Sequence, residues 1–152
     1  MRTIQILLQT TILPSSNDWS IARFSRLAEL LRTYRDPEGR VAFNVVARDR
    51  ERLGEPDPIL SRLDESEFDE LWLFAVDEGD GLTSEDCEGI TRFRRAGRGL
   101  LVTRDHMDVG SSLCTLGGVG KAHHFHTRNR HPDPSRHVAD DPFSTHISWP
   151  NF

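Results

Sequence analysis

Over the first two thirds of the chain, short apolar runs alternate with segments in which apolar residues recur at helical spacing. The run Thr3–Leu8 is short, β-branched and bounded by polar residues, which is typical of a strand. Val41–Val46 predicts a second strand. Glu70–Val76 is apolar on consecutive positions, as expected of a strand covered on both faces, and Leu100–Thr103 predicts a fourth strand.

A first helix is predicted between the first two strands, because apolar residues recur there at helical spacing. Asn17 or Asp18 is the expected N-cap, and the turn formers Asp36-Pro37-Glu38-Gly39 end the helix. The expected apolar face consists of Ile21, Phe24, Leu27, Leu30, Leu31 and Tyr34.

The start of a second helix is the best-marked local feature of the sequence. Thr83 can cap this helix, and Asp86 stands three residues later, where a capping box usually has Glu or Gln. Leu82 and Cys87 occupy the two positions of a hydrophobic staple, which accounts for Cys87. Gly97 is expected to close the helix.

This alternation of strands and helices predicts an α/β fold, a three-layer sandwich with a mostly parallel sheet and helices on both faces. Residues 48–64 are charged and predict a loop with a short helical turn around Ile59–Leu63. After Asp108 the pattern weakens, and residues 127–152 predict an extended, loop-rich C-terminal segment. The expected organisation is a single domain over residues 1–152.

Composition narrows the function. A formal net charge of −5 argues against a nucleic-acid binder, which usually presents a basic face. Two cysteines, Cys87 and Cys114, make no disulfide framework and fit a reducing compartment. No signal peptide is recognised, and no apolar run approaches the length that spans a bilayer. We therefore expect a cytoplasmic protein with no membrane or nucleic-acid partner and no cofactor.

Candidate chemistry concentrates where histidine occurs, because all seven histidines follow Asp105. In open parallel sheets ligands bind outside the carboxyl ends of the strands. This rule selects three groups of residues, one after each of three strands: Thr10 and Thr11 after the first strand, Asp77, Glu78 and Asp80 after the third, and Arg104, Asp105 and His106 after the fourth. His106 would act as acid or base with Asp105 orienting it, and Arg104 would hold the ligand. The alternative is that Arg104 and Asp105 pair with neighbouring charges and His106 caps a helix.

Other chemistries are less well supported. His124 and His126 would share one face of a strand and are the reserve candidates for a metal, but the usual companion ligands at fixed spacing are missing. The segment Gly117–Lys121 is not a phosphate loop, because Thr115 and Ala122 replace required residues. No metal site is therefore predicted.

The stretch from Gly81-Leu82-Thr83 to Gly97-Arg98-Gly99 and the following strand resembles the ThuA-like branch of the class I glutamine amidotransferase-like superfamily. The resemblance covers about residues 66–106 and implies a flavodoxin-like sandwich, a ligand pocket at the end of the strand and, for some members, a role in carbohydrate utilisation. Arg98 departs from the middle glycine of the motif, and no cysteine stands in the nucleophile elbow. Glutamine hydrolysis through a cysteine is therefore not expected.

Two functions remain open. The first is a domain that binds a polar small molecule, with a sugar derivative as one candidate, at the carboxyl edge of the sheet; as an enzyme it would be a hydrolase or isomerase. The second is a non-catalytic interaction subunit whose histidine- and aromatic-rich C-terminal segment forms a homo-oligomer. In that case Phe143, Trp149 and Phe152 would be buried between chains.

Overall fold

The computed structural model describes residues 2–14, 20–74 and 81–103. Within these residues four parallel strands form one sheet in the order β2-β1-β3-β4. The strands are β1 (Ile4–Thr10), β2 (Phe43–Arg48), β3 (Glu70–Phe74) and β4 (Gly99–Thr103). The predicted α/β class and parallel sheet are confirmed.

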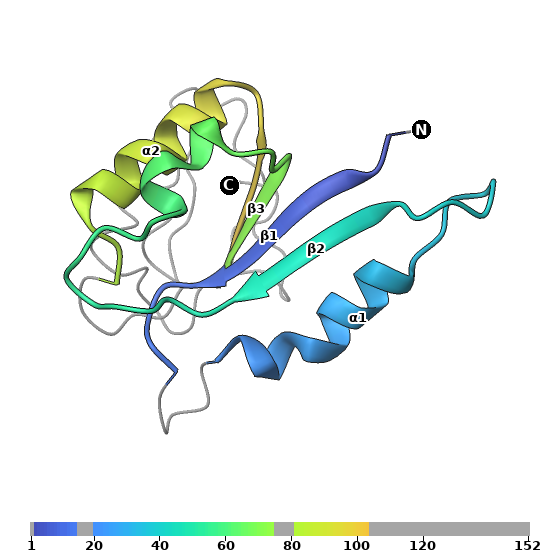
Figure 1. Ribbon diagram of the computed structural model, residues 1–152, viewed down its shortest axis with the longest axis horizontal. Coiled ribbons are helices and arrows are strands. Elements are labelled where there is room, and N and C mark those ends of the chain that lie inside the picture. Colours follow the sequence, from blue (N-terminus) through green and yellow to red (C-terminus); the bar gives the residue numbers. More distant parts are fainter. Residues whose placement is uncertain (1, 15–19, 75–80, 104–152) are drawn as a thin grey trace, which may run out of the picture.

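Helices cover both faces of this sheet (Figure 1). One face carries the short 3₁₀ helix η1 (Ile21–Phe24) and the helix α1 (Ser25–Thr33). The other face carries a second 3₁₀ helix, η2 (Leu60–Glu65), and the helix α2 (Ser84–Arg95). Each layer buries its own apolar cluster against the central strands.

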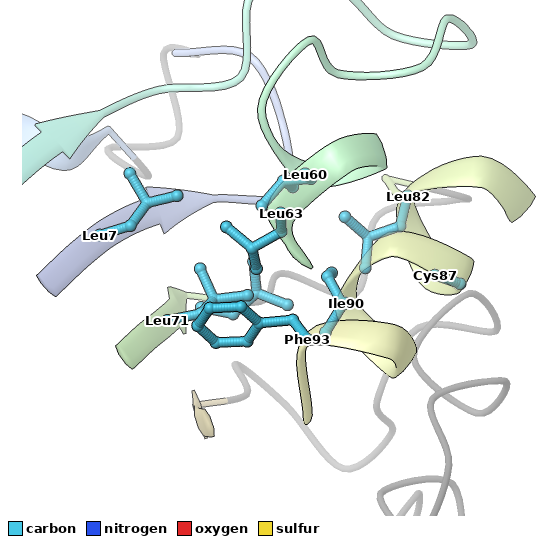
Figure 2. Close-up of a cluster of buried hydrophobic side chains, with 9 residues drawn as sticks. Leu7, Leu60, Leu63, Leu71, Leu82, Cys87, Ile90 and Phe93 are labelled. Carbon is cyan, nitrogen blue, oxygen red and sulfur yellow. The ribbon is translucent and has the colours of Figure 1, made fainter. Parts of the chain in front are cut away.

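The larger cluster lies between the sheet, η2 and α2, as Figure 2 shows. Alternate strand residues face it, since successive side chains of a strand point to opposite sides. Leu71 and Leu73 therefore face α2, while Phe74 and the partly buried Trp72 face α1. This confirms that β3 is covered on both faces, although the described strand ends at Phe74.

A close approach of two backbones holds α2 against η2. A Cβ atom built on Gly89 would lie 2.2 Å from the carbonyl oxygen of Leu60 and 2.6 Å from that of Ser61. No real Cβ atom tolerates such distances, so only glycine permits this packing. The short helical turn predicted around Ile59–Leu63 is confirmed as η2, two residues longer at its end.

The start and end of α2 follow the sequence closely. Thr83 accepts a hydrogen bond from the Asp86 backbone, and the Asp86 side chain accepts one from the Thr83 backbone, which completes the capping box. At the other end, the Gly97 N–H donates to Arg94 and the Arg98 N–H to Phe93, the pattern of a Schellman motif. Gly97 has a φ of 83° there.

The first helix differs from its prediction. Its first turn is the 3₁₀ helix η1, and the α-helix begins only at Ser25. Leu30 and Tyr34 are 65% and 54% exposed, so they do not belong to the buried face. Because α1 contacts mainly β2, only the inner part of the expected apolar stripe packs against the buried cluster of the sheet. The expected caps Asn17 and Asp18 lie outside the described residues.

The second strand is shifted by two residues from the predicted Val41–Val46. Val41 forms an isolated antiparallel bridge with Arg35, and the parallel ladder starts where Ile4 pairs with Phe43. The Asp36–Gly39 turn is confirmed, with the Gly39 N–H donating to the Asp36 carbonyl at 2.8 Å. No helix among the described residues is long and apolar enough to cross a membrane.

Candidate functional site

The carboxyl ends of three strands lie in one row across the sheet. Thr10 is the register partner of Phe74, and Phe74 is that of Thr103. The chain places β2 on one side of β1, and it then places β3 and β4 on the other side. The direction in which strands are added to the sheet therefore reverses between β1 and β3. This switch point at the carboxyl edge is where open α/β sheets bind ligands.

Thr10 and Thr11 form the β1 side of this switch point. The Thr10 hydroxyl lies 3.0 Å from both the Ile12 carbonyl and Asp49 Oδ1, and it accepts the Arg50 N–H at 3.3 Å. The Thr11 N–H donates to the Phe74 carbonyl at 3.2 Å, and the residue is 2% exposed. Both threonines are therefore buried at the end of the strand.

The entry to α2 presses directly against Thr11. A Cβ atom on Gly81 would lie 2.6 Å from the Thr11 carbonyl oxygen and 3.0 Å from its Cβ atom. Only a residue without a side chain allows this approach. The β1 end and the chain before α2 thus form one compact piece of backbone at the candidate edge.

A buried ion pair fixes the loop after β2 to the start of α2. The side chains of Arg50 and Asp86 are both fully buried, and Arg50 Nη1 donates to Asp86 Oδ2 at 2.8 Å. Arg50 also donates to two carbonyls of its own loop, to Arg52 through Nε at 2.7 Å and to Glu55 through Nη2 at 2.6 Å. One guanidinium therefore organises the whole loop.

Asp86 has three functions in this arrangement. Its Oδ2 accepts the capping hydrogen bond from the Thr83 N–H at 3.0 Å as well as the bond from Arg50. Its Oδ1 accepts the Asp57 N–H at 2.7 Å. The carboxylate thus caps α2, neutralises Arg50 and anchors the segment that leads into η2.

Asp57 continues the network toward the sheet. Its Oδ2 accepts Gln9 Nε2 at 2.8 Å, and its Oδ1 accepts Arg48 Nη1 at 2.7 Å. The N–H groups of Ile59 and Leu60 also donate to Oδ1, at 2.9 and 3.1 Å. The amide oxygen of Gln9 also has a partner, because Arg48 Nη1 donates to Gln9 Oε1 at 3.0 Å.

Two opposing effects act on the pKa of Asp57. Burial raises the pKa because it disfavours the charged carboxylate. The hydrogen bonds from Arg48 and from the Ile59 and Leu60 backbones lower it, and they outweigh burial. The pKa of Asp57 therefore lies below its ordinary value, and the group is ionised in the folded protein near neutral pH.

A hollow of about 280 Å³ lies over this loop and is lined by Glu51, Arg52, Glu55, Pro56, Asp57 and Pro58. Its exposed charges pair with each other, since Arg52 Nη1 lies 3.1 Å from Glu55 Oε2. Asp57, its most deeply buried charged side chain, already accepts four hydrogen bonds. The hollow therefore presents no unsatisfied charged group to a ligand.

Of the residues selected from the sequence, Thr10 and Thr11 lie within the described part of the chain. The others lie outside it: Asp77, Glu78, Asp80, Arg104, Asp105, His106, His124 and His126. The same holds for Phe143, Trp149 and Phe152 of the interaction hypothesis, for the segment 127–152, and for Cys114. Within the described residues, no group of three or more His, Cys, Asp or Glu could hold a metal ion.

The sequence interpretation missed the buried network around Arg50 and Asp57. It assigned residues 48–64 to a charged loop, although Arg50 is 1% and Asp57 is 3% exposed. The one sequence feature that pointed to this network was Asp86, because the carboxylate of an acidic N3 residue can accept a hydrogen bond from a second group as well as from the start of the helix. Nothing in the sequence connects it to Arg50, which is far away along the chain.

The comparisons with known proteins give no relative, since no family model, no curated protein and no solved structure matches this chain. The fold therefore defines the class: an α/β protein with a parallel sheet whose strand order reverses between β1 and β3.

Proposed function

We propose that this chain is a flavodoxin-like α/β domain, akin to the ThuA-like proteins, that binds a polar small molecule at the carboxyl edge of its sheet. The strand order β2-β1-β3-β4 carries the proposal. It matches the first four places of the flavodoxin-like order 2-1-3-4-5, in which the ligand sits at the switch point between β1 and β3.

Arg104, Asp105 and His106 supply the chemistry of the proposed site. They follow Thr103 directly in the sequence, and Thr103 ends β4 in the same row as Thr10 and Phe74. Arg104 holds an anionic or hydroxyl-rich ligand through its fixed fork of N–H donors. Asp77 and Glu78, which follow β3 in the sequence, contribute carboxylates for hydroxyl groups.

His106 acts as the acid or base of a hydrolysis or an isomerisation. An imidazole exchanges protons near neutral pH, and a neighbouring carboxylate selects its tautomer and raises its basicity. Asp105 has that role. The scaffold supports such a site because the network from Thr10 through Asp49 and Arg50 to Asp86 holds the strand end and the helix start in one geometry.

The test uses defined sugars as probes. Wild-type protein is heated with a panel of hexoses, hexose phosphates and disaccharides, and any compound that raises the midpoint is titrated calorimetrically. A ligand at about a hundredfold its Kd stabilises the folded state by about 2.7 kcal/mol, which such a scan detects. Arg104→Ala should weaken binding, and His106→Asn should abolish turnover while binding persists.

His146→Asn is the matched control, because it removes a histidine that lies far along the sequence from the proposed site. It should leave binding and turnover unchanged. A panel without any stabilising compound contradicts the sugar-like ligand. A stabilising compound whose affinity is the same in wild type and Arg104→Ala contradicts the placement of the site.

A further inference from the structure

Asp49 brings a carboxylate to the carboxyl edge of the sheet beside β1. β2 ends at Arg48, so Asp49 follows it and stands opposite Thr10, the last residue of β1. Asp49 Oδ1 lies 3.0 Å from the Thr10 hydroxyl and accepts the Ile21 N–H at 2.7 Å. One carboxylate thus joins the ends of both strands to the start of η1.

The helical segment that follows β1 therefore begins on a carboxylate of the chain itself. Helix N-termini attract phosphate and carboxylate groups, because their first N–H groups point away from the helix and the helix dipole favours negative charge. The Ile21 N–H is the first of η1, and it donates to Asp49. A phosphate group of a ligand would meet this carboxylate in place of an unoccupied N–H group.

The same arrangement recurs at the start of α2, on the other face of the sheet. Asp86 Oδ2 accepts the Thr83 N–H at 3.0 Å, and the Thr83 hydroxyl accepts the Asp86 N–H at 3.3 Å. This helix also begins at the end of β1, because the chain at Gly81 lies against the Thr11 carbonyl. Carboxylates of the chain thus occupy the starts of the helical segments on both sides of β1.

Asp49 differs from the buried carboxylates nearby in the charge of its partners. The Asp86 carboxylate is neutralised by Arg50, with 2.8 Å between Oδ2 and Nη1. Asp57 is neutralised by Arg48 in the same way, at 2.7 Å. The described partners of Asp49 are a hydroxyl and a backbone N–H, and neither carries a net charge. Its described contacts therefore leave a negative charge at the end of β1.

We propose that Asp49 is a specificity-determining residue, through which the site selects neutral, hydroxyl-rich ligands over their phosphorylated counterparts. This inference rests on the proposed function and adds the charge of the ligand to it. A ligand phosphate beside the end of β1 is repelled by the Asp49 carboxylate, because juxtaposed like charges oppose binding. Hydroxyl groups carry no charge and can donate hydrogen bonds to carboxylate oxygens. Of the two kinds of ligand assigned to Arg104, the anionic one is thereby disfavoured.

The experiment measures by calorimetry the affinities of hexoses and of the corresponding hexose phosphates. The wild type should bind the hexose at least about tenfold more tightly than its phosphate. Asp49→Asn keeps an oxygen for the bonds to Thr10 and Ile21 but removes the charge, so it should lower this ratio by about tenfold, through tighter binding of the phosphate. Glu51→Gln is the matched control, because it removes the same charge from an exposed side chain of the same loop. It should leave the ratio unchanged.

Inorganic phosphate is a second probe, and it needs no variant of Asp49. Compared with chloride at equal ionic strength, it should give no saturable rise in the unfolding midpoint of the wild type. A saturable rise that Arg104→Ala removes overturns this inference while the proposed function stands. The same holds for a hexose phosphate that binds more tightly than its hexose, and for an unchanged ratio in Asp49→Asn. A panel in which no compound binds contradicts the proposed function and this inference together.

Discussion

Replacing Arg50 by methionine removes the guanidinium at the centre of the buried network and leaves an apolar side chain of similar length. Asp86 then remains fully buried with two backbone donors, from Thr83 and Asp57, and no counter-ion. The carbonyls of Arg52 and Glu55 lose their donors as well.

The expected loss is large. Removing one partner of a buried ion pair costs about 3–5 kcal/mol, because an uncompensated charge stays in the interior. Whole domains are stable by only about 5–15 kcal/mol, so Arg50→Met should remove a large share of the total. Arg52→Met is the matched control in the same loop: its pair with Glu55 is exposed, and such pairs contribute about 0–1 kcal/mol.

Urea unfolding followed by circular dichroism gives the free energies, and a double-mutant cycle isolates the pair. Asp86→Asn removes the negative charge but keeps an oxygen for the helix cap. The double variant should therefore be less destabilised than the sum of the single variants, by about 0.5–3 kcal/mol. Additive effects, or an Arg50→Met loss no larger than that of Arg52→Met, would refute the argument.

Three further outcomes follow from the described contacts. Gly89→Ala should lower the unfolding free energy by about 1–3 kcal/mol or more, because the new methyl group meets the Leu60 carbonyl; in an open helix the same change stabilises. Thr83→Ala should lower the unfolding free energy by about 1 kcal/mol, because the Asp86 backbone N–H loses the hydroxyl oxygen that accepts its hydrogen bond. Asp57 has a lowered pKa, so its stabilisation is present above the pKa of the unfolded state and is lost as pH falls through the folded value; Asp57→Asn should flatten this acid loss.

All three are measured by urea unfolding, the last one between neutral pH and about pH 3, below the ordinary carboxyl range. Thr83→Ser keeps the capping oxygen and should stay near the wild type, which tests the cap itself. An increase in stability for Gly89→Ala would contradict the close backbone approach. An acid dependence of Asp57→Asn as steep as that of the wild type would show that other carboxylates dominate.

Local signals predicted much of the fold. Alternating apolar runs and a capping box act over a few residues, so β1, β3 and α2 could be located to within about two residues, the usual precision for element boundaries. The start of β2 was misplaced because Val41 has the residue type of a strand but bridges Arg35. Its pairing partner, and not its own preference, decides where the strand begins.

The buried charges could not be predicted for a different reason. A single sequence shows that Arg50 is charged, and charged residues are almost never fully buried unless they are paired. Its partner Asp86 is supplied by another element of the fold. The candidate site rests on the rule that ligands bind at the carboxyl ends of parallel strands. The structure describes this edge of the sheet and Thr11, and the residues that carry the proposed chemistry come after the strand ends in the sequence.

The central position of β1 has a consequence for synthesis of the chain. β1 is synthesised before both of its partners, because β2 and β3 are formed by residues 43–48 and 70–74, which leave the ribosome later. Until then an apolar strand with both edges open is exposed to solvent and to neighbouring nascent chains. Folding depends on contacts far apart in sequence, which slows it. The yield of native protein should therefore depend on chaperones that hold β1 until β3 has emerged.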